Sequence, residues 1–190
     1  MKIIRKTEID TNILEVGDQM EIELSELGKF TATVHRVADQ GALIIFDDCV
    51  TERPMNEDDT KDGGFWDSDL CKWMNKELIE VFPQEIVPAM HVYENGSRLR
   101  IPTYGEMFGH DGLYENFEAD RDNQLPLMKD RKNRICISPD DEYCWYWLQN
   151  KLRGVYSAAN FALVAYYGFA GYYSASGSYG VRPAFAIKNL

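Results

Sequence analysis

The chain has 190 residues, of which 45% are hydrophobic and 13% aromatic, and its formal net charge is −11. This length suits a single domain, and the composition excludes a disordered chain. No run of about 18 apolar residues occurs, so we expect no membrane span, and the scattered Lys and Arg side chains exclude the basic stripe that nucleic-acid binding needs.

The N-terminal part predicts an antiparallel hairpin or meander. Residues 12–24 and 29–37 alternate apolar and polar positions, and a short apolar run at 43–46 follows Gln40 and Gly41. Such alternation is typical of half-buried strands, and breaks that contain glycine suit turns.

One main helix is predicted near 68–82. Asp67 or Ser68 can cap its start, and Pro83 lies just beyond its end. Its apolar residues recur every three or four positions and so form one stripe, which we expect to face the core. These residues are Leu70, Trp73, Met74 and Leu78, with Val81 or Phe82.

A second, short helix is predicted at 104–109, because Thr103 and Glu106 have the spacing of a capping box. Residues 109–134 then form a long polar excursion. Loops of this length in compact domains are often functional or mobile.

The four cysteines, Cys49, Cys71, Cys136 and Cys144, include no CxxC pair. The spacing therefore indicates neither a zinc site nor a thioredoxin-like motif, and we expect no metal and no cofactor. Four buried thiols in a reducing compartment are the simplest interpretation. A disulfide between Cys136 and Cys144, which flank a turn-like segment, is the alternative.

The character of the sequence changes near residue 144. Residues 145–190 contain no Asp or Glu, whereas they hold seven tyrosines, eight alanines, five glycines and four serines. Residues 145–148, 161–167 and 181–187 read as strands between Gly- and Ser-rich turns. This tail is too short to fold alone, so we expect one domain over 1–190, with 1–143 as scaffold and 144–190 completing a sheet.

Four segments together resemble a bacterial and phage family catalogued as a domain of unknown function. They are Gly17-Asp18, the SDLCKWMN helix at 68–75, Tyr146-Trp147-Leu148, and the GVRPA segment at 180–184. Members carry Arg after Tyr-Trp-Leu, where this chain has Gln149.

That family in turn resembles formylglycine-generating enzymes and the variable proteins of diversity-generating retroelements, which share a C-type-lectin-like fold. The resemblance implies an α+β, C-type-lectin-like single domain with antiparallel or mixed sheets. Because Glu8 and Asp10 precede any apolar stretch, we expect no cleaved signal peptide, and we expect the protein in the cytoplasm or on a phage particle.

The tyrosine-rich tail is the candidate binding surface. Tyr gives a large amphipathic contact area at little entropic cost, and Ser, Gly and Asn adapt their hydrogen bonds around it. The predicted ligand-binding residues lie in or beside turn-like stretches: Tyr156, Asn160, Tyr172, Tyr173 and Tyr179. In the alternative interpretation, Tyr and Ala alternate across a two-faced sheet and half of them are core.

If the tail is a binding surface, Tyr156, Tyr172, Tyr173 and Tyr179 are expected to be exposed on one contiguous face. The apolar members beneath them are expected to be buried, namely Phe161, Val164, Tyr167 and Phe185. Trp147, Arg182 and Pro183 are predicted to be structural, with Arg182 paired to a carboxylate from the first 144 residues.

We therefore expect a non-enzymatic module that binds a protein, glycan or small molecule without a metal, and whose tail a retroelement could diversify. No Ser/His/Asp constellation, phosphate loop or pair of catalytic carboxylates stands out. The alternatives are an oxidoreductase similar to the formylglycine generators, and a purely structural phage or cell-surface domain.

Overall fold

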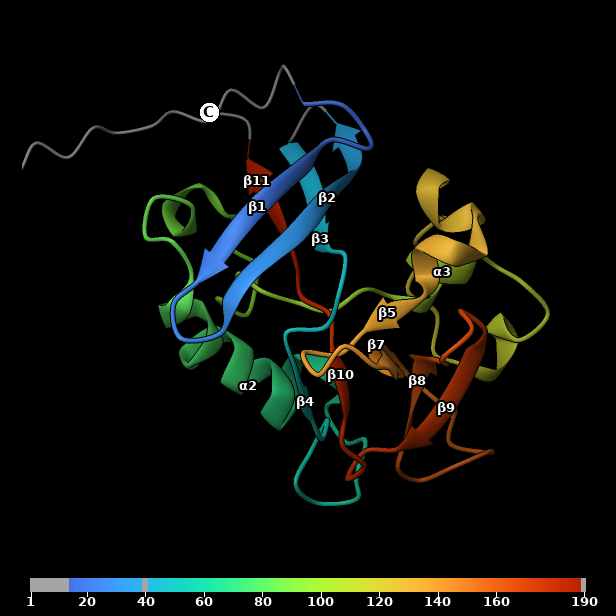
Figure 1. Cartoon of the computed structure of the whole chain (residues 1–190). Helices are drawn as coiled ribbons and strands as arrows, with labels where there is room; N and C mark the ends of the chain where they lie inside the picture. Colours follow the sequence, from blue (N-terminus) through green and yellow to red (C-terminus); the bar gives the residue numbers. More distant parts are fainter. Residues whose placement is uncertain (1–13, 39–40, 189–190) are drawn as a thin grey trace, which may run out of the picture.

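The structure is a computed structural model that describes residues 14–38 and 41–188 (Figure 1). It has a mixed α+β architecture with three sheets. Three expectations concern residues outside the described ranges. They are the absence of a signal peptide, the start of the strand at 12–24 and the turn residue Gln40. Within the described ranges, no helix is long and apolar enough to cross a membrane.

The first sheet has four antiparallel strands in the order β1-β2-β3-β11. Its strands are β1 (Gln19–Leu24), β2 (Gly28–Ala38), β3 (Gly41–Phe46) and β11 (Ala184–Lys188). The predicted N-terminal meander is confirmed, and the last strand of the chain pairs with it.

The second sheet has five strands in the order β4-β10-β7-β8-β9, so β9 is an edge strand. Its strands are β4 (Thr51–Arg53), β7 (Tyr146–Lys151), β8 (Asn160–Val164), β9 (Ala170–Ser174) and β10 (Tyr179–Val181). The β10–β7 pair is parallel and the other pairs are antiparallel, so this sheet is mixed. A small hairpin-like sheet joins β5 (Cys136–Ile137) to β6 (Tyr143–Cys144).

The chain passes from the second sheet to the first between β10 and β11 (Figure 1). The strand predicted over 181–187 is therefore two strands, interrupted at Arg182 and Pro183. Pro183 has no N–H to donate to a ladder, and its carbonyl oxygen accepts a 3.0 Å hydrogen bond from the Phe46 N–H. Pro183 thus lies in the break between the two strands, which is consistent with the structural part expected of it.

The helices are short: α1 (Gly64–Asp67), α2 (Asp69–Lys76) and α3 (Tyr104–Phe108). The Ser68 side chain caps α2 by accepting a 3.0 Å hydrogen bond from the Cys71 N–H. α2 continues almost directly into a 3-10 turn, which confirms the main helix near 68–82. α3 begins with the predicted capping box of Thr103 and Glu106. The 3-10 turns are η2 (Leu78–Val81), η3 (Val87–Ala89), η4 (Tyr114–Asn116), η5 (Pro126–Lys129) and η6 (Arg131–Arg134).

Two apolar clusters form the core on opposite faces of shared strands. In β3, Ala42, Ile44 and Phe46 belong to one cluster, whereas Leu43 and Ile45 belong to the other. β7, β8 and β11 are divided in the same way, because successive side chains of a strand point to opposite faces. The same strands thus hold both clusters together.

The burial predicted beneath the tail is correct for three of its four residues. Phe161, Val164 and Phe185 are fully buried, whereas Tyr167 is 68% exposed. The strand predicted over 161–167 ends at Val164, because a turn follows in which Gly168 has a φ of 74° and donates to the Ala165 carbonyl. Tyr167 lies in this turn and so has no core to enter.

Candidate functional site

Four aromatic side chains gather on one face of the second sheet: Trp145, Tyr166, Tyr173 and Tyr179. We call them the aromatic cluster. The rings of Trp145 and Tyr179 stack with centroids 5.8 Å apart, and Tyr173 lies edge-on to Tyr179 at 5.2 Å. Tyr166 lies edge-on to Trp145 at 5.4 Å. Tyr166 and Tyr173 are 47% and 49% exposed, so the cluster presents aromatic surface to solvent.

Trp147 fixes the cluster to the core. It is fully buried, and its indole N–H donates to the Arg53 carbonyl at 2.8 Å. Its ring lies edge-on to Tyr179 at 5.0 Å and to Phe161 at 6.4 Å. Because packed aromatic pairs hold one another in defined orientations, the exposed rings stand on a rigid support.

Polar groups are distributed over the cluster. Burial, together with the neighbouring hydroxyl of Tyr173, raises the pKa of Tyr179 to about 12, so its hydroxyl is a neutral donor and acceptor at physiological pH. The indole N–H of Trp145 is buried without a hydrogen-bond partner in the described part of the chain. The cluster therefore combines ring faces with hydrogen-bonding groups.

The structure separates the predicted ligand-binding residues. Tyr173 pairs with Phe161 across β8 and β9, whereas Tyr172 pairs with Ala162. Neighbouring residues of a strand point to opposite faces, so Tyr172, which is 55% exposed, lies on the face opposite the cluster. The expectation of one contiguous face is therefore wrong.

The other two predicted residues lie away from the cluster. Tyr156 is exposed in the segment between β7 and β8, and Asn160 is half-buried opposite Ser174 at the start of β8. Of the five predicted residues, Tyr173 and Tyr179 come together in the cluster, and Tyr179 is half-buried there instead of exposed as predicted.

Basic side chains flank the turn that carries Tyr166. The Arg131 guanidinium lies 4.8 Å from the centroid of the exposed Phe169 ring, and Arg134 donates to the Gly168 carbonyl at 3.0 Å. The tail thus lacks carboxylates of its own and meets local positive charge on a chain that is negative overall.

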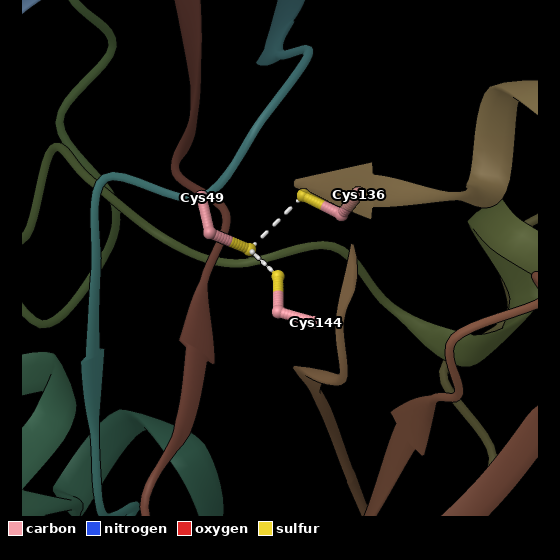
Figure 2. Close-up of side chains that lie close together, drawn as sticks. All are labelled: Cys49, Cys136 and Cys144. Atoms are coloured by element: carbon pink, nitrogen blue, oxygen red, sulfur yellow. Dashed lines mark hydrogen bonds between the residues drawn. The ribbon is translucent and has the colours of Figure 1, made fainter. Parts of the chain in front are cut away.

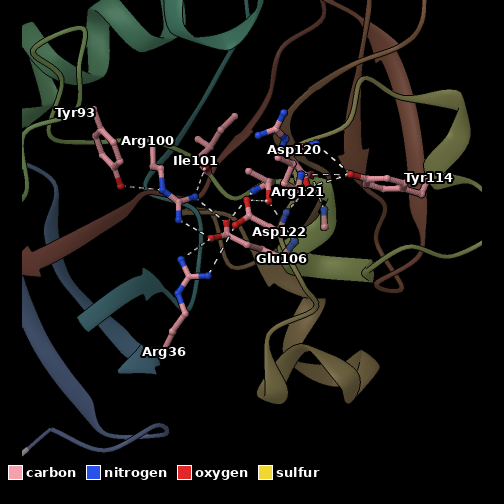
Figure 3. A network of polar contacts seen from close by, with 11 residues as sticks. Arg36, Tyr93, Arg100, Ile101, Glu106, Tyr114, Asp120, Arg121 and Asp122 are labelled. Atoms are coloured by element: carbon pink, nitrogen blue, oxygen red, sulfur yellow. Dashed lines mark hydrogen bonds and ion pairs between the residues drawn. The ribbon is translucent and has the colours of Figure 1, made fainter. Parts of the chain in front are cut away.

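A polar network elsewhere joins Arg36 of β2 to Glu106 of α3 and to Arg100 (Figure 3). Arg100 and Glu106, both buried, form a two-pronged ion pair with N–O distances of 2.7 and 2.6 Å. Glu106 also accepts from the Thr103 N–H at 3.0 Å, and Arg36 approaches it at 3.6 Å. Burial alone raises the pKa of Glu106, but the charge and hydrogen bonds of Arg100 outweigh it and hold the pKa below its usual value.

This network lines one side of a 480 Å³ pocket. On another side the ring centroids of Trp66 and Tyr93 lie 5.0 Å apart. Lys151 and Glu118 contribute opposite charges to the lining. Gln149, which stands where the resembling family has Arg, also lines the pocket, and its side chain donates to the Ile101 carbonyl at 2.5 Å.

Within residues 14–38 and 41–188, Arg182 does not have the predicted carboxylate partner. It is 2% exposed, and its guanidinium donates to the carbonyls of Phe46 and Asn133 and to the Tyr146 hydroxyl. The residue is structural as expected, but carbonyl and phenol oxygens satisfy it, because it lies at the crossing between the sheets where the main chain presents these groups.

Sequence reasoning missed three features: Trp145 and Tyr166 of the aromatic cluster, the polar pocket, and the meeting of Cys49, Cys136 and Cys144. All four cysteines are buried and none forms a disulfide, as expected. The pattern of Trp145 and Trp147 on one face of a strand was the available signal for the cluster. Nothing in the local spacing shows that three distant cysteines meet.

The fold and this surface define a mixed α+β domain that carries an anchored, partly exposed aromatic cluster. Residues 39–189 match the family described as Domain of unknown function (DUF6273), so the chain belongs to that family. The matched region begins just before β3, and β1 and β2 precede it. No curated protein and no solved structure matches the chain.

Proposed function

We propose that this domain is a non-enzymatic binding module and that the aromatic cluster is the centre of a surface for a protein partner. One observation carries the proposal: Tyr166 and Tyr173 are about half exposed although they pack on Trp145, Tyr179 and the buried Trp147. Tyr and Trp residues that are already held in place lose little entropy on binding and supply many hot spots of protein interfaces.

The charges around the cluster are mixed: Arg131 and Arg134 flank the turn that carries Tyr166, whereas Ser174, next to Tyr173, donates a hydrogen bond to the Asp59 carboxylate. Residues 145–190 bring no carboxylate that would have to be desolvated or that would repel such a partner. Arg131 is exposed beside Phe169, at the turn that carries Tyr166. We therefore propose a partner surface with apolar groups for the rings and acidic side chains for this basic flank.

The experiment is a selection followed by mapping of the bound face. Binders are selected against the purified chain from a displayed library of protein fragments, and the complex is mapped by hydroxyl-radical footprinting. We expect protection of Trp145, Tyr166 and Tyr173 and no protection of Tyr172. Protection of Tyr172 and Tyr156 without the cluster, or failure to select any binder, would contradict the proposal.

A second candidate is a small polar ligand in the 480 Å³ pocket. Its support is the Trp66–Tyr93 pair beside Lys151 and Glu118, because pockets that bind small molecules combine aromatic walls with a few placed polar groups. Replacement of Trp66 with Ala distinguishes the two: it abolishes binding of a pocket ligand and leaves the footprint on the aromatic cluster unchanged.

We also propose that the fold is C-type-lectin-like and that the protein acts in the cytoplasm or on a phage particle. The support is the order of the motifs along the chain, ending with the segment at 180–184 that crosses between the sheets. Diversification of the tail by a retroelement belongs to the same proposal. A reverse-transcriptase gene with an imperfect repeat of the codons for 145–190 would support it, and a metabolic operon would speak against it.

A further inference from the structure

Three cysteines from distant parts of the chain meet in the interior (Figure 2). The Cys49 sulfur lies 3.0 Å from that of Cys136 and 3.3 Å from that of Cys144, and all three sulfur atoms lie within 4.8 Å of one another. The two short separations are closer than the van der Waals contact of sulfur atoms. Two thiolates on one ion with metal–sulfur bonds of about 2.3 Å lie about 3.8–4.0 Å apart, so Cys136 and Cys144 would each need to move less than about 1 Å from Cys49 to hold an ion between them.

The chain is shaped around this thiol cluster of Cys49, Cys136 and Cys144. Cys49 precedes β4, whereas Cys136 and Cys144 are directly opposite each other in the β5–β6 pair. At Gly180, an added Cβ would lie 2.5 Å from the Cys49 sulfur and 3.2 Å from the Cys144 sulfur. Only glycine leaves room here for the sulfurs, so the backbone of β10 is fitted to them.

A buried positive charge lies close to the thiols. Arg182 follows two residues after Gly180, which packs against the Cys49 and Cys144 sulfurs, and none of its hydrogen-bond partners is a carboxylate within the described residues. A buried charge without a counter-charge is costly. Thiolates in the neighbouring cluster would supply the missing negative charge.

We propose that Cys49, Cys136 and Cys144 bind one thiophilic d10 metal ion as three thiolates. Thiolate sulfur selects Cu(I) and Zn(II) over hard cations, and each thiol releases its proton as its metal–sulfur bond forms. Three thiolate ligands suffice for Cu(I). With a divalent ion, the charges of the ion, the three thiolates and the Arg182 guanidinium would sum to zero. The shared chemistry is a trigonal set of sulfur ligands, and the two ions are separate arms of the test.

This site goes beyond the proposed binding function and is independent of it. Cys144 directly precedes Trp145, so the ion would fix the start of β7 beneath the aromatic cluster. Its role would be structural, because the three sulfurs are at most 4% exposed and leave no path for a substrate.

The test is a competition titration of the reduced, anaerobic protein. Zn(II) and Cu(I) are added in the presence of a chromophoric chelator for each ion. We expect one ion per chain for at least one of the two. Cys136→Ser should weaken binding by at least about 100-fold, since even the loss of an outer-shell partner costs 10–100-fold.

Cys71→Ser is the matched control, because Cys71 is also buried but contacts Ser97 and Asn75 instead of the thiol cluster. It should bind the metal as the wild type does. Equal affinity in C136S and C71S would overturn the proposal. So would a reduced wild type that takes up neither ion.

A measurement on the wild type alone covers the case in which C136S does not fold. X-ray absorption should find three sulfur neighbours, at about 2.3 Å for zinc. Binding should also release close to three protons per ion, because each thiol loses its proton as its metal–sulfur bond forms. Nitrogen or oxygen neighbours in place of sulfur, or uptake without proton release, would refute the site.

Discussion

Removal of the Glu106 carboxylate should destabilise the fold strongly. In Glu106→Ala, the buried Arg100 guanidinium keeps the Tyr93 hydroxyl and the Ile101 carbonyl but loses the one carboxylate that it pairs with among the described residues, at 2.6 and 2.7 Å. Breaking a buried ion pair from one side costs about 3–5 kcal/mol. For a chain of this size that corresponds to a fall in Tm of roughly 6–20 °C.

Urea denaturation and calorimetry at pH 7 measure this loss. Arg100→Leu combined with Glu106→Leu should cost less than Glu106→Ala alone, because no uncompensated charge remains. A Glu106→Ala protein within about 1 kcal/mol of wild type would refute the reasoning. A double variant that loses the sum of both single changes would refute it as well.

The same pair predicts a pH dependence. The pKa of Glu106 in the folded state is depressed, mainly because Arg100 overcomes the effect of burial. Its stabilisation is therefore complete above the unfolded pKa of about 4.3 and is lost as the pH falls further. The stability difference between wild type and Glu106→Gln should shrink below pH 4, and a difference that grows there would contradict this assignment.

Two further experiments test the opposite burial of Phe185 and Tyr167 and the protonation of the buried His35. Phe185→Ala should cost about 3–5 kcal/mol through the cavity it leaves, while Tyr167→Ala should stay within about 0.5 kcal/mol; equal losses in urea denaturation would contradict their opposite burial. Burial and the nearby Arg182 lower the pKa of His35 to about 4, so the wild type should lose about 3 kcal/mol between pH 6.5 and 4 as the unfolded state takes up the proton. His35→Leu should lack that slope in urea titrations at several pH values, and an unchanged slope would exclude His35 as its source.

Local signals predicted the local structure well. The Ser68 cap and the box of Thr103 with Glu106 depend on residues three apart, and both form as expected. The strand over 161–167 was too long, because the apolar run continues past the turn that Gly168 closes. Recognition of β9 would also have separated Tyr172 from Tyr173, since their alternation follows from strand geometry.

Long-range pairing was beyond sequence reasoning. The order β4-β10-β7-β8-β9 places Trp145 next to Tyr179, and the separate β5–β6 pair brings Cys136 and Cys144 beside Cys49. No periodicity encodes that order. The partners of Arg182 were missed for the same reason, because the carbonyls that satisfy it come from β3 and η6.

The central claim is that the aromatic cluster binds the partner, and a matched pair of variants tests it most directly. Tyr172 and Tyr173 are neighbours on one strand and are 55% and 49% exposed, but they lie on opposite faces of the sheet. The measurement is the Kd of a selected protein partner for the wild type, Tyr172→Ala and Tyr173→Ala. We predict that Tyr173→Ala raises the Kd by more than about 5-fold, the effect of 1 kcal/mol, while Tyr172→Ala changes it by less than about 2-fold. Equal effects of the two variants, or a larger effect of Tyr172→Ala, would contradict the claim.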